Sequence, residues 1–206
     1  HQNPTGLTMS QAKRTRLAAM ARRYQFYVIA DEAYQLVNFD NSNAGLLPLF
    51  YEDDPDDPRI LSVGTFSKLI GPGMKVGWVQ AQPALLNPLA DIGFIGAGNN
   101  PVIFNSTGLV NFLESGALKE HINFVSQELG RKCALLCSEL RAAGLVLREP
   151  TGGYFVWVHS HNGKMTGRSG AGMSLEPADQ YSEYMRLCFA WLTDEQIVEG
   201  VRSLRA

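Results

Sequence analysis

Residues 64–78 read Gly-Thr-Phe-Ser-Lys-Leu-Ile-Gly-Pro-Gly-Met-Lys-Val-Gly-Trp. Lys68 follows the hydroxyl residues Thr65 and Ser67 and precedes a glycine-rich turn, in a segment otherwise apolar enough to be buried. A lysine held away from water loses ammonium solvation, so its free amine becomes a nucleophile toward carbonyl groups. The two hydroxyls, with the surrounding backbone amides, suit an anion such as a phosphate.

Pyridoxal 5'-phosphate carries both a carbonyl group and a phosphate, and it binds to proteins through a lysine. We therefore expect Lys68 to form the imine with this cofactor, and Thr65 and Ser67 to contact its phosphate. Taken alone, a lysine is more often a solvated surface charge, so the interpretation depends on the rest of the chain.

Five stretches, in order, resemble motifs of the class I/II aminotransferases of fold type I. They are residues 1–6 (His-Gln-Asn-Pro-Thr-Gly), 28–34 (Val-Ile-Ala-Asp-Glu-Ala-Tyr), 64–78, 149–157 (Glu-Pro-Thr-Gly-Gly-Tyr-Phe-Val-Trp) and 184–190 (Tyr-Met-Arg-Leu-Cys-Phe-Ala). The sequence of residues 2–10 is most similar to the branch of the family that contains 2-aminoadipate, kynurenine and aromatic aminotransferases. The resemblance covers nearly the whole chain but only the C-terminal part of a family member. We therefore expect a fragment of a longer enzyme.

The order of apolar runs predicts an α/β fold, and the resemblance makes it fold type I. Strands are expected at 26–30, 60–63, 76–80, 145–147, 149–157 and 184–190, and helices at 83–92, 102–114, 118–142 and 194–204. We expect residues 1–130 to form the C-terminal part of a cofactor-binding large domain with a mostly parallel sheet. Residues 131–206 would form a small C-terminal α/β domain. The strands present would leave a sheet edge and an apolar face uncovered.

Local signals predict four further details. Thr8 and Gln11 form a capping box, with Ser10 as a second N-cap candidate, for a helix that carries Leu17, Met20 and Ala21 on one face. The helix's charges, Arg14 included, are expected on its solvated face. Residues 40–58 read as a surface loop, and Gly71 and Gly73 as a turn that needs unusual φ angles.

The resemblance assigns the catalytic roles to Lys68, Asp31 and Tyr34. Asp31 ends a buried strand, where its carboxylate would hold a proton on the pyridine nitrogen. Tyr34 and Asn3 would bond the cofactor's phenolic oxygen. The bland alternatives are a turn aspartate, a half-buried core tyrosine and an Asn-Pro turn residue.

The resemblance places Lys75 at the cofactor phosphate, and Arg186 with Asn3 at the substrate carboxylate. Lys75 stands where the family usually has arginine, which binds phosphate with two bonds where lysine offers a point charge. The stretch 159–184 is shorter than in the family, which reshapes the small domain. Asn99-Asn100-Pro101 resembles a segment that reaches the neighbouring subunit.

The implied function is transamination between an amino acid and a 2-oxo acid, by a homodimer. One alternative is a degraded, non-catalytic chain that acts as a structural or regulatory partner. Another is a different reaction on the same scaffold, such as a lyase, or the ligand-binding half of a transcription regulator.

Composition narrows the partners and the location. A net charge of −2 with no basic stripe argues against nucleic acid as a binding partner. The sequence contains no run of about 18 apolar residues that could span a membrane. The histidines show no metal-ligand spacing, so no metal is expected. Three cysteines, an odd count, favour reduced thiols and a cytoplasmic location, with a mitochondrial one as the alternative.

Overall fold

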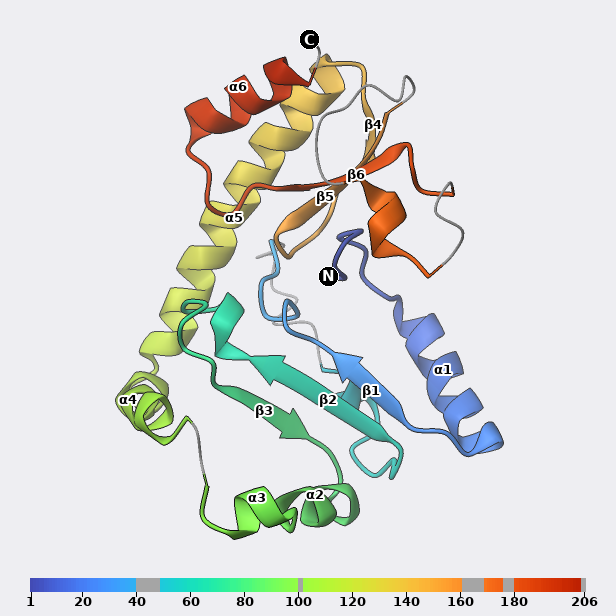
Figure 1. The fold of residues 1–206 in the computed structure, drawn as a ribbon, viewed down its shortest axis with the longest axis vertical. Coiled ribbons are helices and arrows are strands. Elements are labelled where there is room, and N and C mark those ends of the chain that lie inside the picture. Colours follow the sequence, from blue (N-terminus) through green and yellow to red (C-terminus); the bar gives the residue numbers. More distant parts are fainter. Residues whose placement is uncertain (40–48, 100–101, 161–168, 176–179, 205–206) are drawn as a thin grey trace. The chain divides into compact units, whose positions relative to one another are not determined.

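The chain forms two compact units in a computed structural model that describes residues 1–39, 49–99, 102–160, 169–175 and 180–204 (Figure 1). Unit 1 comprises His1–Thr8, Val37–Asn43 and Phe124–Ala206, and unit 2 comprises Met9–Leu36 and Ala44–Asn123. The main change of unit falls inside the long helix, at residues 123–124. The two N-terminal segments, however, group with the C-terminal part. The expected domain boundary at residue 130 stays a prediction.

Backbone hydrogen bonds explain why residues 37–39 belong to unit 1. The Gly153 amide donates to the Val37 carbonyl at 2.8 Å, and the Phe39 amide donates to the Thr151 carbonyl at 2.9 Å. Pairing between segments more than 110 residues apart cannot be deduced from periodicity, which reports only local structure.

Unit 2 is built on a sheet with the order β1-β2-β3, formed by β1 (Val28–Asp31), β2 (Ile60–Thr65) and β3 (Gly77–Gln80). Strand β2 runs parallel to β1 and antiparallel to β3. The ends of β1 and β2 therefore lie at the same edge of the sheet. These ends carry the motifs of residues 31–34 and 65–68.

Helix α1 (Gln11–Tyr24) packs against this sheet through Ala18 and Ala21, which share a core with Val28, Phe50 and Ile60. The predicted capping box is wrong. The second candidate, Ser10, is the N-cap residue, although its side chain makes no capping bond. The Thr8 hydroxyl lies 2.8 Å from His1 Nδ1.

The inward face of α1 also differs from the prediction. Met20 is 40% exposed, whereas Arg14 is buried. The Arg14 guanidinium pairs with Asp53 at 2.6 Å and lies over the Phe50 ring. A charged side chain becomes stable inside the fold when a carboxylate compensates it, and here that carboxylate lies 39 residues away.

Residues 49–58 are a surface loop only in part, because residues 54–58 form turns in which Pro55, Asp56 and Pro58 are exposed. They contain a short 3-10 helix, η1 (Phe50–Asp53), and they bury the Phe50 ring and the Asp57 carboxylate, which accepts a bond from Arg22 at 2.6 Å. The rest of the expected loop, residues 40–48, lies outside the described residues.

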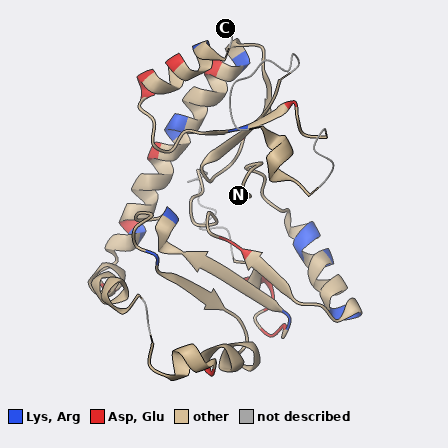
Figure 2. Cartoon of the chain, in the orientation of Figure 1, with Lys and Arg blue, Asp and Glu red and all other residues tan. Residues whose placement is uncertain are grey.

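Helices α2 (Pro83–Ala90), α3 (Gly93–Gly96), α4 (Ile103–Glu114) and α5 (Ala117–Ala142) follow β3. The short α3 was not predicted. Residues 81–113 carry a single charge, Asp91, and α2 to α4 accordingly stand out as nearly uncoloured in Figure 2. Large apolar side chains are exposed on α4, where Phe104 is 87% exposed, and on β1, where Ile29 is 70% exposed. The expected uncovered apolar surface is therefore present.

Unit 1 contains an antiparallel sheet of β4 (Val146–Arg148), β5 (Phe155–His159) and β6 (Tyr184–Cys188), followed by α6 (Asp194–Ser203). The predicted order of three strands and a helix is confirmed, although β5 begins later than expected. One face of the sheet packs on α5 and α6. The buried side chains there are Leu129, Cys133, Leu136, Cys137, Leu140, Val156, Val158, Met185, Phe189, Ile197 and Val201.

The short connection between β5 and β6 is described only in part. Ser169 bridges to Met185, and a 3-10 helix, η3 (Gly170–Met173), follows. Among the helices of the described residues, none is long and apolar enough to cross a membrane.

Candidate active site

Lys68 ends a single 3-10 turn, η2 (Phe66–Lys68), directly after β2. The loop is closed at its base, because the Phe66 amide donates to the Val76 carbonyl at 3.0 Å. Thr65 also donates its hydroxyl to that carbonyl and accepts the Ser67 amide, both at 3.1 Å. The turn that carries Lys68 is thus held at its start by Thr65.

These bonds change the role expected for Thr65. Its single hydroxyl proton is directed to the Val76 carbonyl, so in this conformation it has no second proton to donate to a phosphate. Thr65 shapes the turn, and the Ser67 hydroxyl is the side-chain donor that remains for an anion.

Lys68 and Tyr34 are brought together by the parallel pairing of β1 and β2. Lys68 Nζ lies 5.8 Å from the centroid of the Tyr34 ring, within the range of a cation–π contact. Both side chains are half-buried. The lysine is therefore less enclosed than the sequence suggested, although it does contact the tyrosine that the motif places beside it.

Asp31 differs more clearly from its prediction. It does end β1, but it is exposed, because the strand is covered by unit 2 on only one of its faces. Its Oδ1 accepts the Ala33 amide at 3.2 Å, and within the described residues its carboxylate forms no ion pair. The carboxylate shapes a turn and is also accessible to a ligand.

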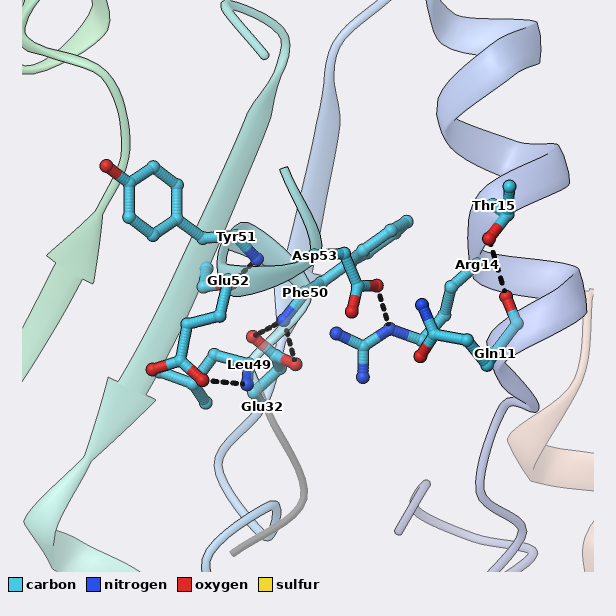
Figure 3. A network of polar contacts seen from close by, with 10 residues as sticks. Gln11, Arg14, Thr15, Glu32, Leu49, Phe50, Tyr51, Glu52 and Asp53 are labelled. Atoms are coloured by element: carbon cyan, nitrogen blue, oxygen red, sulfur yellow. Dashed lines mark hydrogen bonds and ion pairs between the residues drawn. The ribbon is translucent and has the colours of Figure 1, made fainter. Parts of the chain in front are cut away.

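The neighbouring Glu32 occupies the protected position instead (Figure 3). Both of its carboxylate oxygens accept the Phe50 amide, at 2.9 and 3.1 Å. Burial raises the pKa of Glu32, and its hydrogen bonds with Ser62 and Phe50 oppose this shift. No sequence signal indicated this role of Glu32, since the Phe50 amide lies in the stretch read as a loop.

The Glu32 network fixes the end of β1 to η1 (Figure 3). The Tyr51 amide donates to Ser62 Oγ on β2 at 2.9 Å, and the Leu49 amide donates to Glu52 at 3.0 Å. These two bonds hold η1 in place, and the bonds from the Phe50 amide to Glu32 connect η1 to the segment from Asp31 to Tyr34.

Lys75 has a positive φ of 52° and an exposed side chain. The prediction for Gly71 and Gly73 is wrong, because neither has a positive φ and a Cβ on either would meet nothing within 4 Å. The unusual backbone conformation of the turn falls on the lysine that was expected at the phosphate.

In unit 1 the structure joins the two residues expected at the substrate carboxylate. Arg186 Nη1 donates to Asn3 Oδ1 at 2.7 Å, and the guanidinium lies 4.4 Å from the centroid of the Phe155 ring. Arg186 sits opposite Trp157 in the β5–β6 ladder and is half-buried. Phe155, which no sequence motif assigned to the site, thus packs its ring against the guanidinium.

Two glycines allow the N-terminal turn to approach the small sheet. A Cβ on Gly6, whose φ is +68°, would lie 2.7 Å from the Phe155 carbonyl oxygen, and one on Gly152 would lie 2.2 Å from the His1 ring. Larger residues there would displace the turn that carries Asn3.

The Asn99-Asn100-Pro101 segment is described only in part. Asn99 is exposed at the end of the described segment, and Asn100 and Pro101 lie outside the described residues. Among the described residues no group of three or more His, Cys, Asp or Glu side chains could hold a metal ion.

Comparison with known proteins agrees with these motifs. The family model described as Aminotransferase class I and II matches residues 1–204. An aromatic-amino-acid aminotransferase from Thermococcus litoralis is 28% identical over 98% of this chain and 51% of its own length. An uncharacterized HTH-type transcriptional regulator of Bacillus subtilis, YisV, is 29% identical over 77% of this chain and 32% of its own length.

Solved structures show the same fold. A multiple substrate aminotransferase from Thermococcus profundus superposes with a TM-score of 0.84 at 28% identity, and covers 99% of this chain and 53% of that one. LysN, an alpha-aminoadipate aminotransferase from Thermus thermophilus, superposes with a TM-score of 0.81 at 26% identity, over 99% and 55% of the two chains. The chain thus spans about half the length of these relatives. The match of the family model over nearly every residue shows that this chain belongs to the class I and II aminotransferases.

Proposed function

We propose that the full-length protein transfers the amino group of an amino acid to a 2-oxo acid with the aid of pyridoxal 5'-phosphate. The observation that carries the proposal is the contact between Lys68 and the Tyr34 ring at the shared edge of β1 and β2. An amine nucleophile and a phenol at the ends of adjacent parallel strands occupy the place where such sheets bind ligands.

The chemistry of the described residues fits this cofactor. Lys68 offers a primary amine, Ser67 and Lys75 offer a hydroxyl and a cation for the phosphate, and Asp31 offers an accessible carboxylate for the pyridine nitrogen. Thr65 contributes through the turn it stabilises, because its hydroxyl is bonded to Val76. When bound, the cofactor supplies an aldehyde for the amines and an electron-withdrawing ring.

Each side chain then has a defined task. Lys68 moves the proton of the substrate Cα through its Nζ atom, as base and then as acid. Asp31 holds a proton on the ring nitrogen, and the charge of that carboxylate is what the task requires. The Tyr34 hydroxyl would donate to the phenolic oxygen, a role that the family resemblance also gives to the Asn3 amide.

Arg186 would recognise the substrate's α-carboxylate, since a guanidinium can donate two parallel bonds to it. The bond from Arg186 to Asn3 and the Phe155 ring support this role by holding the guanidinium in one orientation. Names of the relatives suggest aromatic amino acids and 2-aminoadipate as the first amino donors to assay.

Borohydride reduction of the cofactor-loaded protein, followed by peptide mapping, tests the proposal. We expect the adduct on Lys68 alone, its loss in Lys68→Ala, and its retention in the surface control Lys119→Ala. Turnover should likewise disappear only in Lys68→Ala. An adduct mapped to another lysine would overturn the assignment.

The similarity to YisV supports a second candidate, the ligand-binding part of a transcription regulator. This reading predicts cofactor binding without turnover of any amino acid in the panel. Measurable 2-oxo acid production that depends on Lys68 decides for the enzyme.

The proposal includes a homodimer in the cytoplasm. The exposed apolar residues of α4, such as Ile103 at 60% and Phe104 at 87%, support self-association. Three free cysteines support a reducing compartment. Sedimentation of the full-length protein and fluorescence microscopy of a tagged copy test these two statements.

A further inference from the structure

Two side chains outside the motifs bond to the backbone of the lysine loop. His121, on α5, places Nε2 2.9 Å from the carbonyl oxygen of Leu69. A carbonyl only accepts hydrogen bonds, so Nε2 must carry the proton. The Phe112 ring, edge-on at 5.8 Å, supports the imidazole in this orientation.

The second side chain is Asn105, on α4. Its Nδ2 donates to the Met74 carbonyl at 2.7 Å. Met74 directly precedes Lys75, the residue whose φ is positive. A side-chain donor on this carbonyl fixes the peptide that enters the unusual conformation.

The two hydrogen bonds hold opposite ends of the loop from Lys68 to Lys75. Its base is closed by the bond from Phe66 to Val76. His121 then holds the residue after Lys68, and Asn105 holds the residue before Lys75. Each bond therefore lies one residue from a lysine that is expected to contact the cofactor.

We propose that His121 and Asn105 are positioning residues, His121 for the Lys68 amine and Asn105 for the Lys75 ammonium. This proposal rests on the proposed function, because the two lysines matter only if they bind the cofactor, although its main test uses no cofactor. Removing the His121 donor leaves a backbone carbonyl unbonded at Leu69, which is 4% exposed, so the turn must open to reach water. The Lys68 amine then becomes more accessible to solvent and is held less firmly in one orientation.

Competitive labelling of lysines in the cofactor-free, full-length protein tests the His121 arm. An amine-reactive reagent is applied in trace amounts, and mass spectrometry gives the rate at each lysine. We expect His121→Leu to raise the Lys68 rate about fivefold, as expected for the loss of one buried hydrogen bond. The rate at the exposed Lys119 should not change, and His121→Gln, which keeps a donor, should stay near wild type.

Glu120→Gln, at the neighbouring position on α5, is the matched control and should leave Lys68 unchanged. Should His121→Leu not fold, His121→Ala serves the same comparison. A Lys68 rate equal in wild type and in the folded donor-free variant overturns the proposal. If the rate rises while Lys68→Ala still turns over, the positioning inference holds and the proposed function fails.

Inorganic phosphate tests the Asn105 arm, because it needs no cofactor either. We expect Asn105→Leu to weaken phosphate binding to the cofactor-free protein about fivefold and to leave Lys68 labelling unchanged. Thr107→Val, on the same helix, is the control and should bind as wild type. Unaltered phosphate affinity in a folded Asn105→Leu protein removes Asn105 from the proposal.

Discussion

Arg186 donates a 2.7 Å hydrogen bond to the side-chain oxygen of Asn3, a residue 183 positions earlier in the chain. The guanidinium has five N–H donors and spends one on this bond. Asn3 therefore orients the guanidinium without neutralising it, which is what recognition of an anion requires.

Asn3→Asp should convert this bond into an ion pair. The new carboxylate competes with the substrate carboxylate for Arg186, so we expect KM for the amino donor to rise about tenfold or more. Steady-state kinetics measure the change, with Asn3→Ser as the neutral control that keeps KM closer to wild type. Equal KM values in Asn3→Asp and Asn3→Ser would show that Arg186 does not bind the carboxylate.

Arg186→Lys should lower kcat/KM about tenfold or more, because lysine keeps the charge but loses the two parallel bonds. The visible spectrum of the cofactor-loaded protein without substrate should not change. Titrations with an amino acid and with the matching amine separate the effect on the carboxylate. An identical response of both ligands to the substitution would exclude Arg186 as the carboxylate site.

Asp31→Asn separates the two roles of Asp31. Asparagine can still accept the Ala33 amide, so the turn and the fold should persist, but it carries no charge to keep a proton on the ring nitrogen. We expect kcat to fall about 100-fold or more while the cofactor remains attached to Lys68. Retention of most of the wild-type rate would mean that Asp31 serves the turn alone.

Local motifs predicted the parts of the site that depend on strand ends. Lys68 and Tyr34 follow adjacent parallel strands, so periodicity and the motif together were enough to place them at one edge. Arg186 could be located on β6 because the motif of residues 184–190 marks that strand. Its bond to Asn3 depends on the packing of an N-terminal turn that no local pattern reveals.

The failures share a physical cause. Arg14 was predicted to be solvated because its partner, Asp53, lies in the stretch 40–58 that was read as a surface loop. Glu32 was not noticed because its donor, the Phe50 amide, lies in that same stretch. Gly71 and Gly73 were read as the strained positions of the turn, but composition shows only which residues tolerate a positive φ. The tertiary bond from Asn105 accompanies that conformation at Lys75.

Lys75 offers a substitution with two effects of opposite sign. Lys75→Gly should raise the free energy of unfolding by about 1 kcal/mol, because glycine adopts a positive φ without steric cost. The same change removes a cation from the expected phosphate site, so cofactor affinity should fall. Denaturant unfolding and cofactor titration measure the two effects, and a stabilised protein with unchanged affinity would make Lys75 a surface lysine.

Arg14→Leu should destabilise unit 2 by about 3 kcal/mol, since it leaves the largely enclosed Asp53 carboxylate without its partner. Urea unfolding measures the loss. The double variant Arg14→Leu with Asp53→Leu should recover much of it. Arg141→Leu, which breaks an exposed pair with Glu149, is the control and should change stability little. A double variant no more stable than Arg14→Leu would show that the arginine matters for packing and not for the charge pair.

Glu32 should make folding stability fall as pH rises. Burial raises the pKa of this carboxyl above its ordinary value of 4.5, so the folded state binds the proton more tightly than the unfolded state does. The stabilisation is fully present below the ordinary pKa and is lost as pH rises through the higher folded pKa. Glu32→Gln has no proton to lose and keeps an oxygen for the Phe50 amide. The free energy of unfolding of Glu32→Gln relative to wild type should therefore increase across this window and level off above it. Urea unfolding at a series of pH values measures the difference, and one that stays constant or decreases with pH would contradict the burial of Glu32 as a shifted acid.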